Sequence, residues 1–142
     1  MRTVVIIGNA CPWTAENKPG GVECWGINNG WRQMPDGFLY DAWDRWFDVH
    51  PEAHIKARRP RHWEWMEMQT GDRPIYLTEP HPDIRGSVAY PLTDVQTAFG
   101  QKGVPEEFFT SSLDYCLALA LFEGVDRLEV YGADMYASHE RQ

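Results

Sequence analysis

The hydrophobic and polar positions of the chain form short apolar runs separated by polar turns. Thr3–Ile7 is β-branched and apolar nearly throughout, which is typical of a strand buried on both faces of a parallel sheet. Further runs with the length and composition of strands cover Val22–Asn28, Arg45–Val49, Ile75–Thr78 and Arg127–Tyr131. Ser87–Tyr90 is compatible with one more short strand.

Helical spacing is clearest between Ser111 and Gly124. Apolar side chains recur there at intervals of three and four residues, and Gly124 suits the position just after a helix because it lacks a β-carbon. A second helix is predicted over Leu92–Phe99. In the charged and aromatic segment 51–71, Pro60 interrupts the pattern, so we expect a loop followed by a short helix over Arg61–Gln69.

The alternation of strands, loops and helices favours an α/β fold. We expect a three-layer, Rossmann-like domain with a mostly parallel sheet of about five strands. The 142 residues fit one such domain, spanning 1–142. The chain also carries seven tryptophans. We interpret those of the 61–69 helix as packing residues, although the tryptophans from Trp43 to Trp65 could instead form a surface for a partner.

The net charge of −8, from 13 basic and 21 acidic residues, excludes some functions. Long nucleic acids are bound through stripes of Lys and Arg, so they are not expected as partners. A single nucleotide held by backbone amides remains compatible with this charge. The three cysteines form no CxxC pair, and no apolar run is long enough to span a membrane. A reducing, cytoplasmic location is the simplest expectation.

Polar residues follow the predicted strands where an open α/β sheet binds its ligands, beyond the carboxyl ends. A run of hydroxyls also precedes the long helix, whose first amides could meet an anion. The candidate ligand-binding residues are Gly8, Asn9, Asn28, Asn29, Thr110, Ser111, Ser112, Gly132 and Asp134. Each also has a purely structural interpretation, as a tight turn or as a helix cap.

Titratable groups in the same region supply candidates for catalysis. A general acid or base must be a titratable side chain in the cleft, which leaves His50, Asp114, Asp134 and His139. Asp48, Asp114 and Asp134 could hold Mg²⁺ if the chain is an enzyme that acts on phosphates. A solvated loop histidine is the alternative interpretation of His50. No metal site follows from the spacing of these residues.

Two blocks of the sequence resemble a known superfamily. The first block resembles the motif around the TSG helix and the GxD loop of two related groups, the family 42 sialyltransferases and the MptE-like pterin-pyrophosphokinase-like proteins. It consists of Thr110–Ala120, Glu123–Gly124 and Val130–Tyr136. Val5–Asn9 and Gly26–Asn29 are similar to the first two strand ends of that group. Small members of the superfamily also occur in phage genomes.

The resemblance implies a site that surrounds a nucleotide. Gly8 and Asn9 would approach the phosphates or ribose, and Asn28 would contact the nucleotide. The hydroxyls from Thr110 to Ser112 would bind polar groups of the donor. Gly132 and Asp134 would face the ribose or the base.

The sequence also departs from the family pattern. The glycine of the TSG motif is Ser112 here, and only eight residues follow Asp134, where the sialyltransferases continue with a lid and a catalytic histidine. We therefore expect a protein that binds a nucleotide or nucleotide-derived small molecule, with sequestration of a signalling nucleotide in the host cytoplasm as the role of a phage-encoded member. The alternatives are a small transferase or phosphodiesterase, and an interaction protein. Self-association into a homo-oligomer is left open.

Overall fold

The computed structural model describes residues 1–9, 20–34, 36–98 and 111–132. Six strands in these ranges form one parallel sheet in the order β5-β4-β3-β2-β1-β6. The strands are β1 Thr3–Ile7, β2 Glu23–Ile27, β3 Arg45–Phe47, β4 Ile75–Leu77, β5 Ser87–Ala89 and β6 Arg127–Tyr131. The predicted α/β class is confirmed. The run near Ser87, which was compatible with one more short strand, forms β5 and brings the number of strands in these ranges to six.

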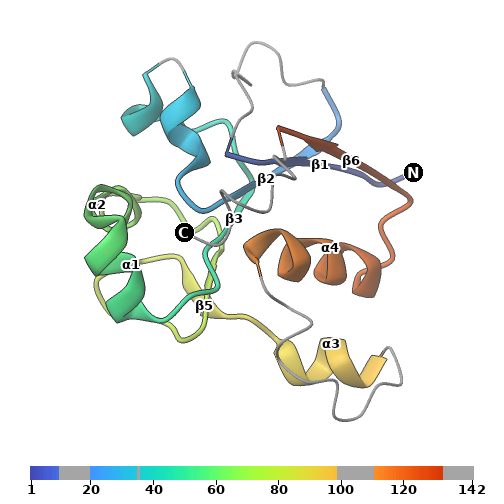
Figure 1. The fold of residues 1–142 in the computed structure, drawn as a ribbon. Coiled ribbons are helices and arrows are strands. Elements are labelled where there is room, and N and C mark those ends of the chain that lie inside the picture. Colours follow the sequence, from blue (N-terminus) through green and yellow to red (C-terminus); the bar gives the residue numbers. More distant parts are fainter. Residues whose placement is uncertain (10–19, 35, 99–110, 133–142) are drawn as a thin grey trace.

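Helices connect these strands and cover both faces of the sheet. The α-helices of the described ranges are α1 Glu52–Arg58, α2 Pro60–Glu67, α3 Leu92–Ala98 and α4 Ser112–Phe122, and two 3₁₀ helices, η2 Gly30–Gln33 and η3 Gly37–Leu39, follow β2. None of the helices described is long and apolar enough to cross a membrane. Figure 1 shows α1 and α2 on the opposite side of the sheet from α3 and α4.

The loop predicted before Arg61 is wrong, because α1 fills much of it. Pro60 does not break a helix; it occupies the first turn of α2. Proline fits there because the first amides of a helix have no intrahelical partner in any case. A single proline can therefore mark the border between two helices, and the sequence pattern did not distinguish that from a loop.

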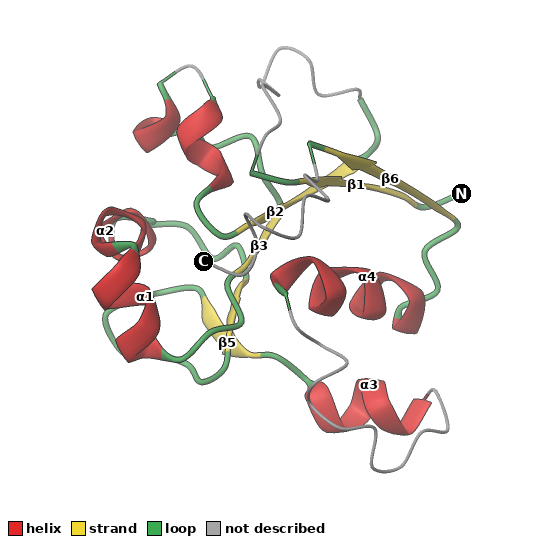
Figure 2. Ribbon diagram, viewed as in Figure 1, coloured by secondary structure: helices red, strands yellow, loops and turns green. Residues whose placement is uncertain are grey.

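The core divides into two layers, one on either side of the sheet. Figure 2 shows helices on both of these sides. In β1, Val5 and Ile7 face the layer of α1, α2 and the 3₁₀ helices, whereas Val4 and Ile6 face α3 and α4. This alternation follows from the two-residue period of a strand. With both faces covered, all five β1 residues are buried, as the uniformly apolar run predicted.

Six tryptophans lie in the described ranges, and none is more than 6% exposed. They are Trp25, Trp31, Trp43, Trp46, Trp63 and Trp65. Trp65 contacts three other indoles, and its ring centroid lies 4.7 Å from that of Trp46. The packing interpretation is thus confirmed for these rings. Their burial contradicts the alternative in which the tryptophans from Trp43 to Trp65 form a partner surface.

The long helix α4 is closed at both ends by local interactions. The Ser111 hydroxyl accepts a hydrogen bond from the Asp114 amide at 3.4 Å, so Ser111 is the N-cap. At the other end Gly124 has a φ of +72°, and its amide donates to Leu121 O. Val125 N donates to Ala120 O, which completes a Schellman motif. These caps fix where α4 begins relative to the sheet.

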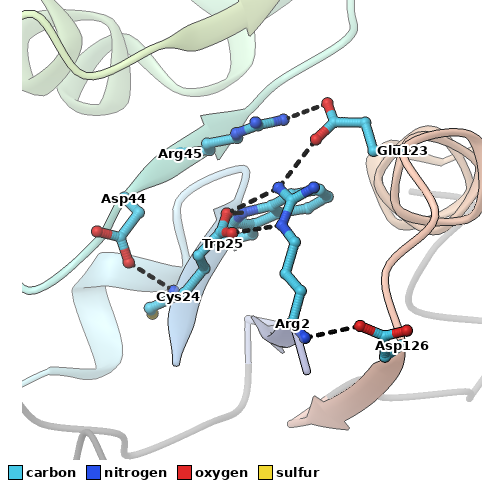
Figure 3. Close-up of polar contacts among 8 residues, drawn as sticks. Arg2, Cys24, Trp25, Asp44, Arg45, Glu123 and Asp126 are labelled. Atoms are coloured by element: carbon cyan, nitrogen blue, oxygen red, sulfur yellow. Dashed lines mark hydrogen bonds and ion pairs between the residues drawn. The ribbon is translucent and has the colours of Figure 1, made fainter. Parts of the chain in front are cut away.

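Ion pairs tie the end of α4 to the amino-terminal edge of the sheet (Figure 3). Glu123 accepts from Arg45 Nη1 at 2.6 Å and from Arg2 Nη2 at 2.9 Å. Arg2 also pairs with Glu23, and Arg45 lies over the Trp25 ring at 4.7 Å. Burial alone would raise the pKa of Glu123, but the hydrogen bonds from the two arginines outweigh it and lower that pKa. The network orients α4 with its first turn at the carboxyl edge.

Candidate functional site

Because the sheet is parallel, the residues that follow its strands lie at one edge. Gly8 follows β1, Asn28 follows β2, His50 follows β3 and Gly132 follows β6. Backbone hydrogen bonds join these ends: Gly8 N donates to Tyr131 O, and Asn28 N donates to the carbonyl of the last β3 residue, both at 2.8 Å. The structure therefore brings the described strand-end candidates to a common edge.

The turns after β1 and β2 pack directly against each other. A β-carbon built on Gly30 would lie 3.1 Å from Gly8 O and 3.5 Å from Asn9 Oδ1. A side chain at the second position of the Asn29–Gly30 turn would therefore force its neighbours to shift by a few tenths of an ångström. The turns that contain Gly8, Asn9 and Asn29 thus lie against each other at this edge, and Asn28 precedes the second of them.

Asn28 has the most unusual conformation in this surface. Its φ of +49° lies in the left-handed region, which asparagine tolerates better than most residues. Its carbonyl accepts a hydrogen bond from Trp46 Nε1 at 2.7 Å, which holds the backbone in place. The buried Oδ1 of its side chain has no hydrogen-bond partner. A buried amide oxygen without a partner is unusual, because most buried polar groups in proteins are hydrogen-bonded.

The two described serines of the predicted hydroxyl run have internal partners. Ser111 caps α4, as the structural alternative proposed. Ser112 is fully buried, and its hydroxyl accepts from Val49 N at 3.2 Å, which joins the start of α4 to the end of β3. Asp114 lies in the first turn of α4. The candidates Thr110, Asp134 and His139 lie outside the described residues.

A buried carboxylate organises the end of β3. Asp48 is fully buried, and its Oδ1 lies 2.5 Å from His50 Nδ1 and 3.0 Å from Arg59 Nη2. Its Oδ2 lies 2.7 Å from Arg59 Nη1 and 3.1 Å from His62 Nε2, although these two contacts lack hydrogen-bond alignment. His50 is therefore anchored at its Nδ1, and the interpretation of a freely solvated loop histidine is wrong.

The second histidine of this cluster is held neutral. Trp31 Nε1 donates to His62 Nδ1 at 2.9 Å, and an indole nitrogen can only donate. His62 must then accept at Nδ1 and carry its proton on Nε2, which faces Asp48. Complete burial lowers the pKa of His62 and outweighs the opposing effect of Asp48. Asp48, His62 and Trp31 thus form a continuous polar chain inside the core.

Asp48 itself stays ionised. Burial alone would raise its pKa, but the contacts with His50 and His62 and the charge of Arg59 outweigh it and lower the pKa. A carboxylate surrounded by these groups is not free to bind a cation. In the part of the chain that the structure describes, no group of three or more His, Cys, Asp or Glu residues could hold a metal ion. Of the three candidate Mg²⁺ ligands, Asp48 is thus engaged by other side chains, and Asp134 lies outside the described residues.

Sequence reasoning found only part of this cluster. Asp48 and His50 were accessible because they directly follow a predicted strand. Three members were missed because they lie outside the strand ends. Arg59 lies at the junction between α1 and α2, His62 lies in α2, and Trp31 lies in η2. The sequence signal for these residues was the run of arginines around Pro60. Nothing in the sequence indicated that one of these arginines would contact a buried carboxylate.

A cleft of about 210 Å³ opens beyond the ends of β3 and β4. Polar groups of its lining come from the β3 end, from α1 and from the segment after β4; they are His50, Glu52, Thr78, Glu79 and His81. Trp63 and Ile55 supply apolar surface. The sequence analysis did not predict this cleft, because it placed no ligand residues after β4.

Comparisons with known proteins identify no relative. No protein-family model matches the chain, and no curated protein or solved structure matches it. The class that the fold defines is an α/β protein with a six-stranded parallel sheet.

Proposed function

We propose that the protein binds a nucleotide or a nucleotide-derived small molecule at the carboxyl edge of its sheet. The observation that carries this proposal is the close packing of the Asn29–Gly30 turn against Gly8 and Asn9 at this edge, beside the buried and unpartnered amide oxygen of Asn28. Backbone and side-chain amides of this kind suit a nucleotide without requiring many basic residues. The motif resemblance to nucleotide-binding proteins supports the same assignment.

The proposal predicts that removing the Asn28 side chain weakens binding without unfolding the protein. Asn28→Gly is the suitable variant because glycine accepts the φ of +49° at no steric cost. Loss of one or two hydrogen bonds should weaken binding about tenfold. The measurement is titration calorimetry against mono-, di- and cyclic nucleotides and ADP-ribose.

The matched control is Asp36→Gly. Among the described residues other than glycine, Asn28 and Asp36 have a positive φ, and that of Asp36 is +53°. Asp36 lies before η3 rather than at a strand end. This variant should bind like the wild type. If no nucleotide of the panel binds the wild-type protein, the proposed function is wrong.

A second candidate function is a small transferase or phosphodiesterase. One observation favours it: His50 lines the cleft at the same edge while its Nδ1 is held by the ionised Asp48. A histidine held in this way can exchange a proton with a substrate. Incubation of the bound nucleotide with and without Mg²⁺ separates the two functions. Intact ligand after long incubation would support binding, and sequestration as the role.

A further inference from the structure

The cleft beyond β3 and β4 is small for a ligand site. Its volume of about 210 Å³ lies below the roughly 300–1,000 Å³ of typical small-molecule sites. It lies at the same edge of the sheet as the proposed nucleotide surface. Strand β3, which His50 follows, pairs with β2, and Asn28 N donates to Phe47 O at the end of β3 at 2.8 Å. The cleft therefore has the size and the position of a subsite for one ring attached to a nucleotide.

Two of the polar residues of the cleft, His81 and Glu52, already have partners. His81 accepts from Asp83 N at its Nδ1 and faces Glu52 with its Nε2 at 3.2 Å. Glu52 also pairs with Lys56 at 2.7 Å. His81 is therefore not available to a ligand without loss of an existing contact, whereas Glu52 makes both of these contacts through Oε1 and keeps acceptor capacity at Oε2.

His50 is different, because only one of its ring nitrogens is used. Two groups face its Nδ1: Asp48 Oδ1 at 2.5 Å, which can only accept, and Arg59 Nη2 at 3.3 Å, which can only donate and also bonds Asp48. The shorter contact places the proton of a neutral His50 on Nδ1. The lone pair of Nε2 is then unused, and no described residue bonds it. The ring is also oriented by stacking on His54, with the centroids 5.0 Å apart and the planes at 9°.

The groups left for a ligand are mainly acceptors. Besides His50 Nε2 they include the Glu79 carboxylate, while the Thr78 hydroxyl can donate or accept. No lysine or arginine belongs to the lining described. A phosphate would meet negative charge there without a cation to balance it. A ring that carries hydroxyl groups offers the donors that these acceptors need.

We propose that this cleft is a subsite for a neutral, hydroxyl-bearing ring attached to the nucleotide, such as a second ribose or a hexose, and that His50 Nε2 accepts a hydrogen bond from one of its hydroxyls. This inference rests on the proposed function. Asp48 acts as a positioning residue through His50, and Arg59 and His62 hold Asp48. The ligand class that follows is a nucleoside diphosphate sugar or ADP-ribose.

The test compares nucleotides with and without the ring. Calorimetry uses two pairs of probes, ADP with ADP-ribose and UDP with UDP-glucose. In the wild type the ring-bearing member of a binding pair should bind about five- to tenfold more tightly, the contribution of a hydrogen bond to an otherwise unpaired acceptor. Equal affinity of both members would overturn the inference and leave the proposed function intact.

Two variants test whether the cleft causes this gain in affinity for the ring-bearing nucleotides. His50→Asn keeps a donor near Asp48 but removes the acceptor at the Nε2 position, and Thr78→Trp fills the cleft from an exposed residue. Both should lose the gain and retain the affinity for ADP or UDP. Glu64→Gln, on the exposed face of α2, is the control that should change neither. Near-ultraviolet circular dichroism verifies that each variant is folded.

The remaining outcomes are also decisive. If the gain persists in both variants, the ring lies elsewhere and the inference is wrong. If both variants lose ADP or UDP affinity as well, the nucleotide itself occupies the cleft, which also overturns it. Binding of neither pair, nor of any other nucleotide, would instead contradict the proposed function. Nitrogen-15 spectra of the imidazoles provide a direct check, because the neutral ring of His50 should carry its proton on Nδ1.

Discussion

Single residues in this protein are most constrained around Asp48. The carboxylate is buried with two histidines and an arginine, and the indole of Trp31 fixes the tautomer of His62. Breaking such a cluster at one member leaves a buried charge without compensation, which is more damaging than the loss of a surface contact. The chemistry of the cluster should therefore be visible in the pH dependence of stability.

The neutral state of His62 makes stability fall as the pH decreases. Its pKa in the folded protein is lower than in the unfolded chain, where it is about 6.5. Below about pH 6.5 the unfolded chain binds more protons, so the contribution is complete above that pH and decreases as the pH falls toward the folded pKa. We expect the free energy of unfolding in urea to decrease between pH 7 and pH 5, by at most about 2 kcal/mol from this group.

The His62→Asn variant tests whether His62 causes this pH dependence of the free energy of unfolding. It is less stable at every pH, but it should lose less stability over the same interval than the wild type. His54 also has a lowered pKa, through burial and the nearby His50, so His54→Asn measures that separate share. Asp48 does not interfere, because its lowered pKa removes stability only below about pH 4. An identical pH dependence in wild type and His62→Asn would contradict the neutral state assigned to His62.

The position of Gly26 has no room for a side chain. A β-carbon there would lie 2.1 Å from the Trp46 ring, which crosses β2 and donates to the Asn28 carbonyl. Gly26→Ala should lower the free energy of unfolding by about 1–3 kcal/mol through overpacking. Gly20→Ala is the control, since nothing lies within 4 Å of its β-carbon. Urea denaturation compares the two, and equal stability of both variants would contradict the packing seen here.

Among the elements, α4 has the clearest relation between sequence and position. Its periodicity, its serine cap and its terminal glycine all predicted where it begins and ends. Strand positions were also predictable, because the apolar runs are short and bounded by turn residues. The two-helix segment from Glu52 to Glu67 was not, since Pro60 is equally compatible with a helix end and a helix start.

The attachment of α4 to the sheet depends on Glu123. Glu123→Gln keeps the shape of the side chain but removes the charge that pairs with Arg2 and Arg45. Because the three side chains are partly exposed, the free energy of unfolding should fall by only about 1 kcal/mol, and by less at high salt. Asp72→Asn is the control, since the pair between Asp72 and Arg85 is largely exposed. A loss no greater than that of the control would mean that packing alone holds α4.

At the scale of the whole molecule, the parallel topology determines where chemistry can occur. Once the strands were recognised, the rule that ligands bind at carboxyl ends placed Asn28 and His50 at one edge, and the structure has them there. The cleft after β4 was not predictable in this way. Its shape depends on side chains from α1 and α2, whose packing no local pattern encodes.

The tryptophans of the α1 and α2 layer have an optical consequence. Trp65 lies at a tilt of 53° to Trp46 and 44° to Trp43, but nearly parallel to Trp31, at 6°. Electronic transitions of neighbouring indoles couple, and a pair whose transition dipoles are inclined to each other gives a circular dichroism couplet. This signal arises from one face of the sheet only. The protein therefore contains its own spectroscopic reporter for the layer that holds Asp48, separate from the helical signal of α4.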